Sequence, residues 1–317
     1  MNKPDHHSNA RPITAAAMTL ILLLGGCAAR EHDPRLTYVA DRGGSDQVYL
    51  HDLTTGQTHQ LTSGAGDKAD PAFSRDGEWV FYSGDADGDW DIYRVNVEDG
   101  EVEKLTWNLT NERFPAATTW DDGVVYLSEN DGGPTLWVIN EPGDSEPLEI
   151  NLELFGDFTY ARWDRRGNWL AYTVEADDYP SPVPSAAGNI WRYNHGAMFF
   201  EGLIEDFADN RHPCWSNDAR WLVFSSNRGP DGADFADDDA DYDLFLFELD
   251  QGEIVRLTDD PGDELWPIVE HDNESLIFYG ELDGVGGLYR RSTTSGRPRY
   301  ELLVPLEEPP RGVSLHP

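Results

Sequence analysis

Along Asp67–Thr106, short apolar or alternating segments are separated by polar turn residues, a pattern typical of consecutive β-strands. The run Trp79–Tyr82 is apolar throughout and rich in aromatic and β-branched side chains, which predicts a short strand buried on both faces. Polar turn residues precede it at Arg75–Glu78. After a loop of Asp and Gly, Asp91–Val97 places apolar side chains at every second position, the period of a strand with two different faces. An Asp-Gly turn then leads into Val102–Leu105, as expected for a hairpin.

The same order returns along the chain with a period of roughly 40 to 55 residues, the range of propeller blades. A phrase of Pro, an aromatic residue, Ser and Asp opens the segment at Pro71 and returns at Pro213, with looser copies at Pro115, Ala161 and Pro267. The closing Leu-Thr pair recurs at Leu61–Thr62, Leu105–Thr106 and Leu257–Thr258. We therefore predict an all-β fold, a six-bladed β-propeller of four-stranded antiparallel blades. Complete repeats start near Asp67, Thr110, Phe155, Asp209 and Gly262.

The first repeat, Leu36–Thr62, lacks its opening strand. The chain ends with His316-Pro317, which matches the start of the innermost strand at His212-Pro213. Because a closed ring leaves no exposed strand edge, we predict that Gly312–His316 pairs beside Leu36–Ala40. A competing closure would use Arg30–Asp33 as the missing strand.

These phrases resemble the repeat of the TolB-like β-propeller family, and the resemblance covers residues 36–317. It implies the propeller fold. It leaves function open, because the same repeat occurs in envelope scaffolds, in sugar lyases and in the lid domain of some serine peptidases. The resemblance also implies that the residues just before each Pro phrase lie near the axis. As a candidate binding site it nominates Asp70, Arg113, Tyr160, His212, Trp266 and His316.

The beginning of the chain has the features of a signal peptide over residues 1–26. Its apolar region, Ile13–Leu24, is too short to span a membrane. The residues Leu24–Cys27 resemble a bacterial lipobox, which implies cleavage before Cys27 and a lipid on its thiol; an ordinary secretory signal is the alternative. Residues 27–34 then form a lipid-anchored tether and residues 35–317 the propeller. Ala28 implies an outer-membrane protein facing the periplasm, attached to the membrane only through the lipid.

Acidic residues dominate the composition, with 60 Asp and Glu against 23 Lys and Arg and a formal net charge of −37. Cleavage after residue 26 removes Lys3, Arg11 and Asp5 and leaves −38. Such a charge excludes nucleic acid and anionic lipid as partners of the propeller. The scarcity of Lys suggests adaptation to salt, although GC-rich coding would also favour Arg. Besides Cys27 only Cys214 is present, so we expect no internal disulfide.

Two acidic loops raise the question of a metal. Aspartates alternate along both loops, as in calcium-binding loops, and the weak calcium candidates are Asp85, Asp87, Asp89, Asp237, Asp239 and Asp241. Neither loop fits the EF-hand rule, because Trp90 and Tyr242 stand where that motif requires Gly. We interpret the loops as solvated acidic hairpins and expect no cofactor, with weak calcium binding as the alternative.

The sequence favours a binding protein over an enzyme. It contains no Gly-x-Ser-x-Gly elbow and no zinc-type spacing of His. Insertions at Glu175–Gly188 and Gly229–Asp241 both fall between the second and third strands of their repeats, so they should project from one face. We predict a monomeric, non-catalytic scaffold whose propeller face binds an envelope protein or polysaccharide. The alternatives are a carbohydrate-active lyase or hydrolase, and a polysaccharide or small-molecule sensor, each using the channel mouth.

Overall fold

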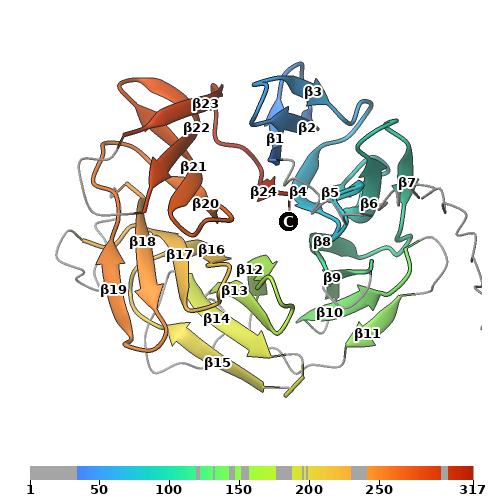
Figure 1. The fold of residues 1–317 in the computed structure, drawn as a ribbon. Helices are drawn as coiled ribbons and strands as arrows, with labels where there is room; N and C mark the ends of the chain where they lie inside the picture. The colour runs from blue at the N-terminus through green and yellow to red at the C-terminus, as the bar shows by residue number, and fades with distance from the viewer. Residues whose placement is uncertain are drawn as a thin grey trace, which may run out of the picture. The chain divides into compact units, whose positions relative to one another are not determined.

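The described part of the chain is a ring of β-sheets. The computed structural model describes residues 34–118, 122–130, 133–142, 147–150, 157–175, 188–194, 196–197, 199–229, 241–293 and 299–316. Within them, 24 strands form six four-stranded antiparallel sheets, which surround a central axis in Figure 1. The prediction of a six-bladed all-β propeller is confirmed. No helix among these residues is long and apolar enough to cross a bilayer.

The first three blades follow the order of the repeats. Blade 1 contains β24 (Val313–Leu315), β1 (Arg35–Asp41), β2 (Asp46–Asp52) and β3 (Thr58–Gln60). Blade 2 contains β4 (Lys68–Phe73), β5 (Trp79–Gly84), β6 (Asp91–Asn96) and β7 (Val102–Lys104). Blade 3 contains β8 (Asn111–Ala117), β9 (Val124–Asn130), β10 (Gly133–Ile139) and β11 (Leu148–Ile150).

The other three blades are each built from consecutive strands. Blade 4 contains β12 (Asp157–Trp163), β13 (Trp169–Glu175), β14 (Asn189–Asn194) and β15 (Phe199–Ile204). Blade 5 contains β16 (Asn210–Trp215), β17 (Trp221–Ser226), β18 (Asp243–Glu248) and β19 (Glu253–Arg256). Blade 6 contains β20 (Leu265–Val269), β21 (Ser275–Leu282), β22 (Val285–Ser292) and β23 (Glu301–Pro305).

The recurring Leu-Thr pair ties the outer strand of a blade to the third strand. The Thr106 hydroxyl accepts a hydrogen bond from the backbone N–H of Ile92 at 2.9 Å. Thr258 accepts in the same way from Leu244 at 2.7 Å. Both hydroxyls are buried, so each satisfies a backbone donor that would otherwise lie in the core without a partner.

The recurring Ser-x-Asp phrase builds the turn between the first and second strands. The Ser74 hydroxyl donates to Asp76 Oδ1 at 2.6 Å and accepts from the backbone N–H of Trp79 at 2.9 Å. Gly77 has φ of +71°, and a Cβ there would overlap the ring of His316. This turn therefore needs glycine both for its backbone conformation and for the close approach of His316.

The core lies between blades. Six clusters of buried apolar side chains occur among the described residues, one at each junction of neighbouring blades. Val80 and Tyr82 pack toward blade 1, whereas Phe81, the residue between them, packs toward blade 3. This placement explains why the second strand of a repeat is apolar on both faces, as the sequence predicts.

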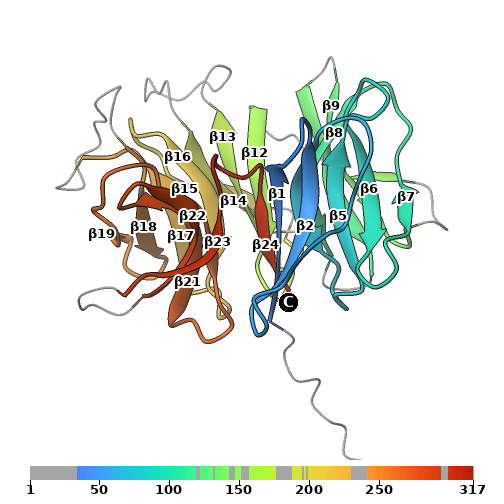
Figure 2. The same ribbon diagram turned by 90° about the horizontal axis from the view of Figure 1, so that it is seen from above.

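Blade 1 is completed by the end of the chain. Strand β24 pairs antiparallel with β1, joining Leu36 to Leu315 and Tyr38 to Val313, and Figures 1 and 2 show the two strands side by side. The backbone N–H of His316 donates to the carbonyl of Arg35 at 2.9 Å. The predicted C-terminal closure is confirmed; Arg30–Asp33, the competing strand, lies outside the described residues.

Candidate functional site

The innermost strands share an unusual backbone feature at the axis. In blades 2 to 6 the register shifts by a β-bulge, as between Ala69 and Ala72 in β4. The first residue of each bulge has φ between +54° and +58° although it is not glycine: Asp70, Phe114, Tyr160, His212 and Trp266. This left-handed conformation costs about 1 kcal/mol or more per residue. Each bulge interrupts the regular alternation of the strand, so the side chains of these five residues point in a different direction from the one a regular strand would give them.

A cavity of about 590 Å³ lies against these bulges. Every blade contributes to its lining, from Asp70 in blade 2 and Phe114 in blade 3 round to Val313 in blade 1. The volume falls in the range of about 300 to 1,000 Å³ that is typical of ligand pockets. Four of the six predicted axial residues line it: Asp70, Tyr160, His212 and Trp266.

Three rings from three blades pack together at the cavity wall. The centroid of His212 lies 4.1 Å from that of Tyr160 and 3.9 Å from that of Trp266. Tyr160 also meets Trp266 edge to face at 5.0 Å. Phe114 adds a further edge contact to Tyr160 at 5.7 Å. We call Phe114, Tyr160, His212 and Trp266 the axial aromatic cluster.

His212 is a neutral imidazole within this cluster. Its side chain is buried, and burial, followed by the charges of Arg211 and Arg162, holds its pKa well below the usual value. Its Nδ1 has no hydrogen-bond partner among the described residues. Because a buried polar atom without a partner is destabilising, this nitrogen is suited to accept from, or donate to, a bound group.

Four arginines supply positive charge to the lining. Arg162 of blade 4 reaches the opposite side of the ring, where its Nη2 donates to the carbonyl oxygen of Val313 in β24 at 2.7 Å. Arg75, Arg165 and Arg166 are exposed and lie in the turns that follow the innermost strands of blades 2 and 4. We call these four residues the channel arginines.

The predicted axial residue Arg113 does not line the cavity. The bulge of blade 3 places Phe114 at that position instead, one residue later. Arg113 Nε donates to Asp70 Oδ2 at 2.8 Å, and the guanidinium lies over the ring of Trp90 at 4.3 Å. Although burial opposes its charge, the Asp70 carboxylate raises the pKa of Arg113. This ion pair neutralises Asp70 at the cavity wall.

His316 lies outside the cavity as well. The pairs Leu36 with Leu315 in blade 1 and Leu222 with Trp215 in blade 5 occupy equivalent registers. The residue equivalent to His212 is therefore Gly312, which has φ of +124°. His316 instead contacts the ring of Phe73 edge to face at 5.4 Å, and its carbonyl lies 2.8 Å from His271 Nε2. The His-Pro dipeptide shared by His212 and His316 therefore suggested the wrong alignment, because Gly312 and not His316 is equivalent to His212.

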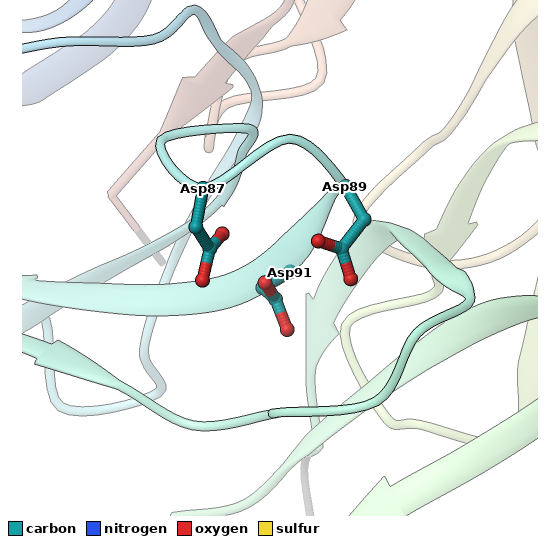
Figure 3. A group of neighbouring side chains, drawn as sticks. All are labelled: Asp87, Asp89 and Asp91. Atoms are coloured by element: carbon teal, nitrogen blue, oxygen red, sulfur yellow. The ribbon is translucent and has the colours of Figure 1, made fainter.

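The first acidic loop, which contains Asp87, Asp89 and Asp91, lies within the described residues. Asp87, Asp89 and Asp91 bring their carboxylates together, as Figure 3 shows. Lys104 Nζ lies 2.6 Å from Asp87 Oδ2 and 2.6 Å from Asp91 Oδ2, so an ammonium group already sits between two of the carboxylates. Burial raises the pKa of Asp91 to about 6. A calcium ion binding there would have to displace Lys104.

The remaining calcium candidates, the lipidation site and the two insertions are described only in part. Asp85 is described, and its Oδ1 accepts from the backbone N–H of Asp67 at 2.6 Å, while Asp241 Oδ2 accepts from the N–H of Gly262 at 3.0 Å. Asp237 and Asp239, Cys27 and most of both insertions are not described. Calcium binding and lipidation therefore remain predictions.

Comparison with known proteins identifies the family. The family described as the Tricorn protease N-terminal beta propeller domain matches residues 42–234, more than half of the chain. The chain belongs to this propeller family. An uncharacterised protein of Agrobacterium fabrum is 32% identical over 92 residues, which are 29% of this chain and 31% of that protein. The matched segment therefore spans about a third of that relative's length.

Solved structures share the propeller fold. TolB from Acinetobacter baumannii has a TM-score of 0.69 at 19% identity, covering 90% of this chain and 67% of its own. A putative TolB from Agrobacterium tumefaciens has a TM-score of 0.63 at 14% identity, with coverage of 87% and 89%. An oligogalacturonate lyase in complex with manganese has a TM-score of 0.54 at 16% identity, with coverage of 84% and 73%. At these identities the likeness concerns the fold, and it confirms the resemblance to TolB-like propellers.

Proposed function

We propose that this chain is a non-catalytic scaffold of the bacterial envelope, anchored by a lipid on Cys27, which holds a protein partner in its channel. The observation that carries the proposal is that all six blades contribute side chains to one cavity on the axis. Rings and charged groups converging on a rigid frame are typical of binding sites. The likeness to TolB structures supports a scaffold, and the lipobox-like residues support the location.

The test is recovery of envelope proteins on purified wild type and on two tryptophan variants. Trp266→Ala removes a ring from the axial aromatic cluster. Trp107→Ala is the matched control, because that ring is 71% exposed and does not line the cavity. A buried aromatic anchor is worth about 2 kcal/mol or more, so we expect the partner's recovery to fall at least about tenfold for Trp266→Ala and to stay unchanged for Trp107→Ala.

A loop deletion separates the channel from the insertions. If removing residues 230–240 abolished partner recovery while Trp266→Ala left it intact, the partner would bind the loops and the channel proposal would be wrong. Circular dichroism of each variant establishes that the propeller has folded.

The second candidate is a carbohydrate-active lyase or hydrolase at the same channel, favoured by the shared fold with the oligogalacturonate lyase. Among the residues lining the cavity, His212 supplies the imidazole that such chemistry would use. Metal analysis of purified protein discriminates: a stoichiometric transition ion that is lost in His212→Ala would favour the enzyme over the scaffold.

A further inference from the structure

Glu264 is a buried acid away from the channel, at the junction of blades 5 and 6. It lies just before β20 of blade 6, beside Asp243 of blade 5, and is fully buried. Among the described residues it is the one carboxylate for which both side-chain oxygens are buried without a hydrogen-bond partner. Because burying an unsatisfied carboxylate is costly, we expect a bound group to supply positive charge or donors here.

The equivalent acid of another repeat is Glu112, at the junction of blades 2 and 3. Each of the two acids follows the Thr of its Leu-Thr pair by six residues. The backbone N–H of Glu112 donates to the carbonyl of Trp90 at 2.6 Å, and that of Glu264 donates to the carbonyl of Tyr242 at 2.6 Å. The two acids are therefore held by the same backbone arrangement, so the side chains around them can be compared position by position.

Glu112 is surrounded by hydrogen-bond donors. Its Oε1 accepts from the Thr110 hydroxyl at 2.7 Å, from the Ser128 hydroxyl at 3.2 Å and from Asn108 Nδ2 at 3.4 Å. Such donors stabilise a buried negative charge, so this acid needs no further group.

The same three positions around Glu264 hold no donor side chain. The residues there are Gly262, Gly280 and Asp260. A Cβ at Gly280 would lie 3.5 Å from Glu264 Cγ, so the missing side chain leaves space directly beside the acid. Two donors are thus replaced by glycine and the third by another carboxylate. Space between carboxylates suits a cation, because a cation supplies the positive charge that the missing donors would have supplied.

Blade 5 adds further oxygen atoms to this site. Asp243 and Thr258 lie close enough to Glu264 to affect its ionisation, although neither forms a hydrogen bond of normal geometry with it. Asp243 Oδ2 pairs with Arg256 Nη2 at 2.5 Å, whereas its buried Oδ1 has no hydrogen-bond partner among the described residues. The three carboxylates of Glu264, Asp260 and Asp243 against this one guanidinium leave a formal charge of −2, which one divalent cation would neutralise.

We propose that Glu264, Asp260 and Asp243 bind a calcium ion at the junction of blades 5 and 6. Calcium takes about six to eight oxygen ligands in irregular geometry, so backbone carbonyls and water would complete its coordination. Magnesium gives up its water reluctantly and is less suited to a fully enclosed acid. Asp260 is only half-buried, which gives the ion a path from solvent. The ion would join two neighbouring blades, independently of what the channel binds.

This site differs from the first acidic loop in what already occupies it. In that loop Lys104 Nζ lies 2.6 Å from each of two carboxylates, so calcium would have to displace an ammonium group. Arg256 is the equivalent of Lys104 in blade 5, and it leaves Asp243 Oδ1 available. Calcium can therefore bind beside Glu264 without displacing a cation.

The test is a calorimetric titration of the metal-free protein with calcium chloride. Burial raises the pKa of Glu264 to about 9 when no ion is bound, so the titration is made at about pH 8, where removing this proton is easier than at neutral pH. Sodium chloride at about 1 M shortens the screening length to about 3 Å and suppresses diffuse binding to a chain of net charge −37. We expect one ion per chain with a Kd of about 1 mM or less.

Thermal unfolding gives a second readout. In about 10 mM calcium chloride the midpoint should rise by about 2–5 °C more than in the same concentration of magnesium chloride, because an ion that binds only the folded state stabilises it. Absence of both the calorimetric signal and this difference would overturn the proposal.

Three variants locate the ion. Glu264→Gln keeps the shape of the side chain and should weaken calcium binding at least about tenfold, and Asp260→Asn, which introduces the amide present at Asn108, should weaken it about tenfold. Glu112→Gln is the matched control, because it makes the same change at the equivalent position of blade 3, and its Kd should stay within about twofold of the wild type. Because Asp260 is only half-buried, Asp260→Asn keeps the test valid if Glu264→Gln fails to fold.

The acidic loops are the competing places for calcium. If the double variant Asp87→Asn/Asp89→Asn, or removal of residues 230–240, abolished binding while Glu264→Gln preserved it, the ion would lie in a loop and the proposed site would be wrong. Retained binding in both loop variants, together with its loss in Glu264→Gln, is the expected result.

Discussion

Val313 in the closing strand offers a direct test of how the ring is held. Its side chain is fully buried among Leu36, Tyr38 and Leu306, at the junction of blades 6 and 1. Val313→Ala removes two carbons from this cluster, about 1.6 kcal/mol of transfer free energy at about 0.8 per methylene group. The cavity left behind raises the expected loss in the free energy of unfolding to about 2–3 kcal/mol. For a domain of this size the thermal midpoint should fall by about 3–5 °C.

Val255→Ala is the matched control, since Val255 lies on the outermost strand of blade 5 and is 47% exposed. Its free energy of unfolding should change by less than about 0.5 kcal/mol. Urea denaturation followed by tryptophan fluorescence compares the two variants with the wild type. Equal midpoints for Val313→Ala and Val255→Ala would show that β24 adds little to the ring, and the reasoning on closure would be refuted.

Three further predictions concern the anchor, the charge and a buried acid. Cys27→Ser should release the protein from the membrane fraction, and equal retention on fractionation would contradict lipid attachment. Raising salt from low concentration to about 1 M shortens the screening length to about 3 Å, so the thermal midpoint should rise; a flat or falling midpoint would exclude salt adaptation. Burial raises the pKa of Glu264 from 4.5 to about 9, because its carboxyl is fully enclosed. The neutral acid therefore stabilises the fold below about pH 4.5, and this contribution is lost progressively as the pH rises toward 9. Glu264→Gln should flatten the decline in midpoint between pH 6 and about 9, whereas a decline as steep as in the wild type would contradict the assignment.

Local patterns in the sequence are sufficient to predict the blades. Alternation along β6, the apolar run of β5 and the turn between β4 and β5 each reflect forces that act within one repeat. The closure was also predictable, because a missing first strand and a surplus last strand complement each other. These inferences succeeded because the same pattern recurs in each repeat, so each copy is further evidence for the same arrangement of strands.

The candidate site was predictable only in part. The resemblance to TolB-like repeats placed Tyr160, His212 and Trp266 near the axis, and the structure brings their rings together. It missed Arg162, because the contact with Val313 joins residues 151 positions apart across the ring. The repeating pattern describes strands within one blade and contains no information about a contact between two distant blades. A signal in the sequence was Arg166, which stands where the equivalent turns of blades 2, 5 and 6 have Asp76, Asp218 and Asp272.

The composite first blade also sets an order of events during folding. Strand β1 is synthesised before blades 2 to 6, but its partner on the axis, Val313–Leu315, is synthesised only after them. Blades 2 to 6 can each form from consecutive strands, whereas blade 1 must wait for a contact of very high sequence separation. The ring thus completes only after blade 6 and β24 have been made, and until then the apolar face of β1 next to blade 6 stays uncovered. A circularly permuted chain that joins His316 to Arg35, neighbours in the folded ring, would make this blade contiguous and remove the delay.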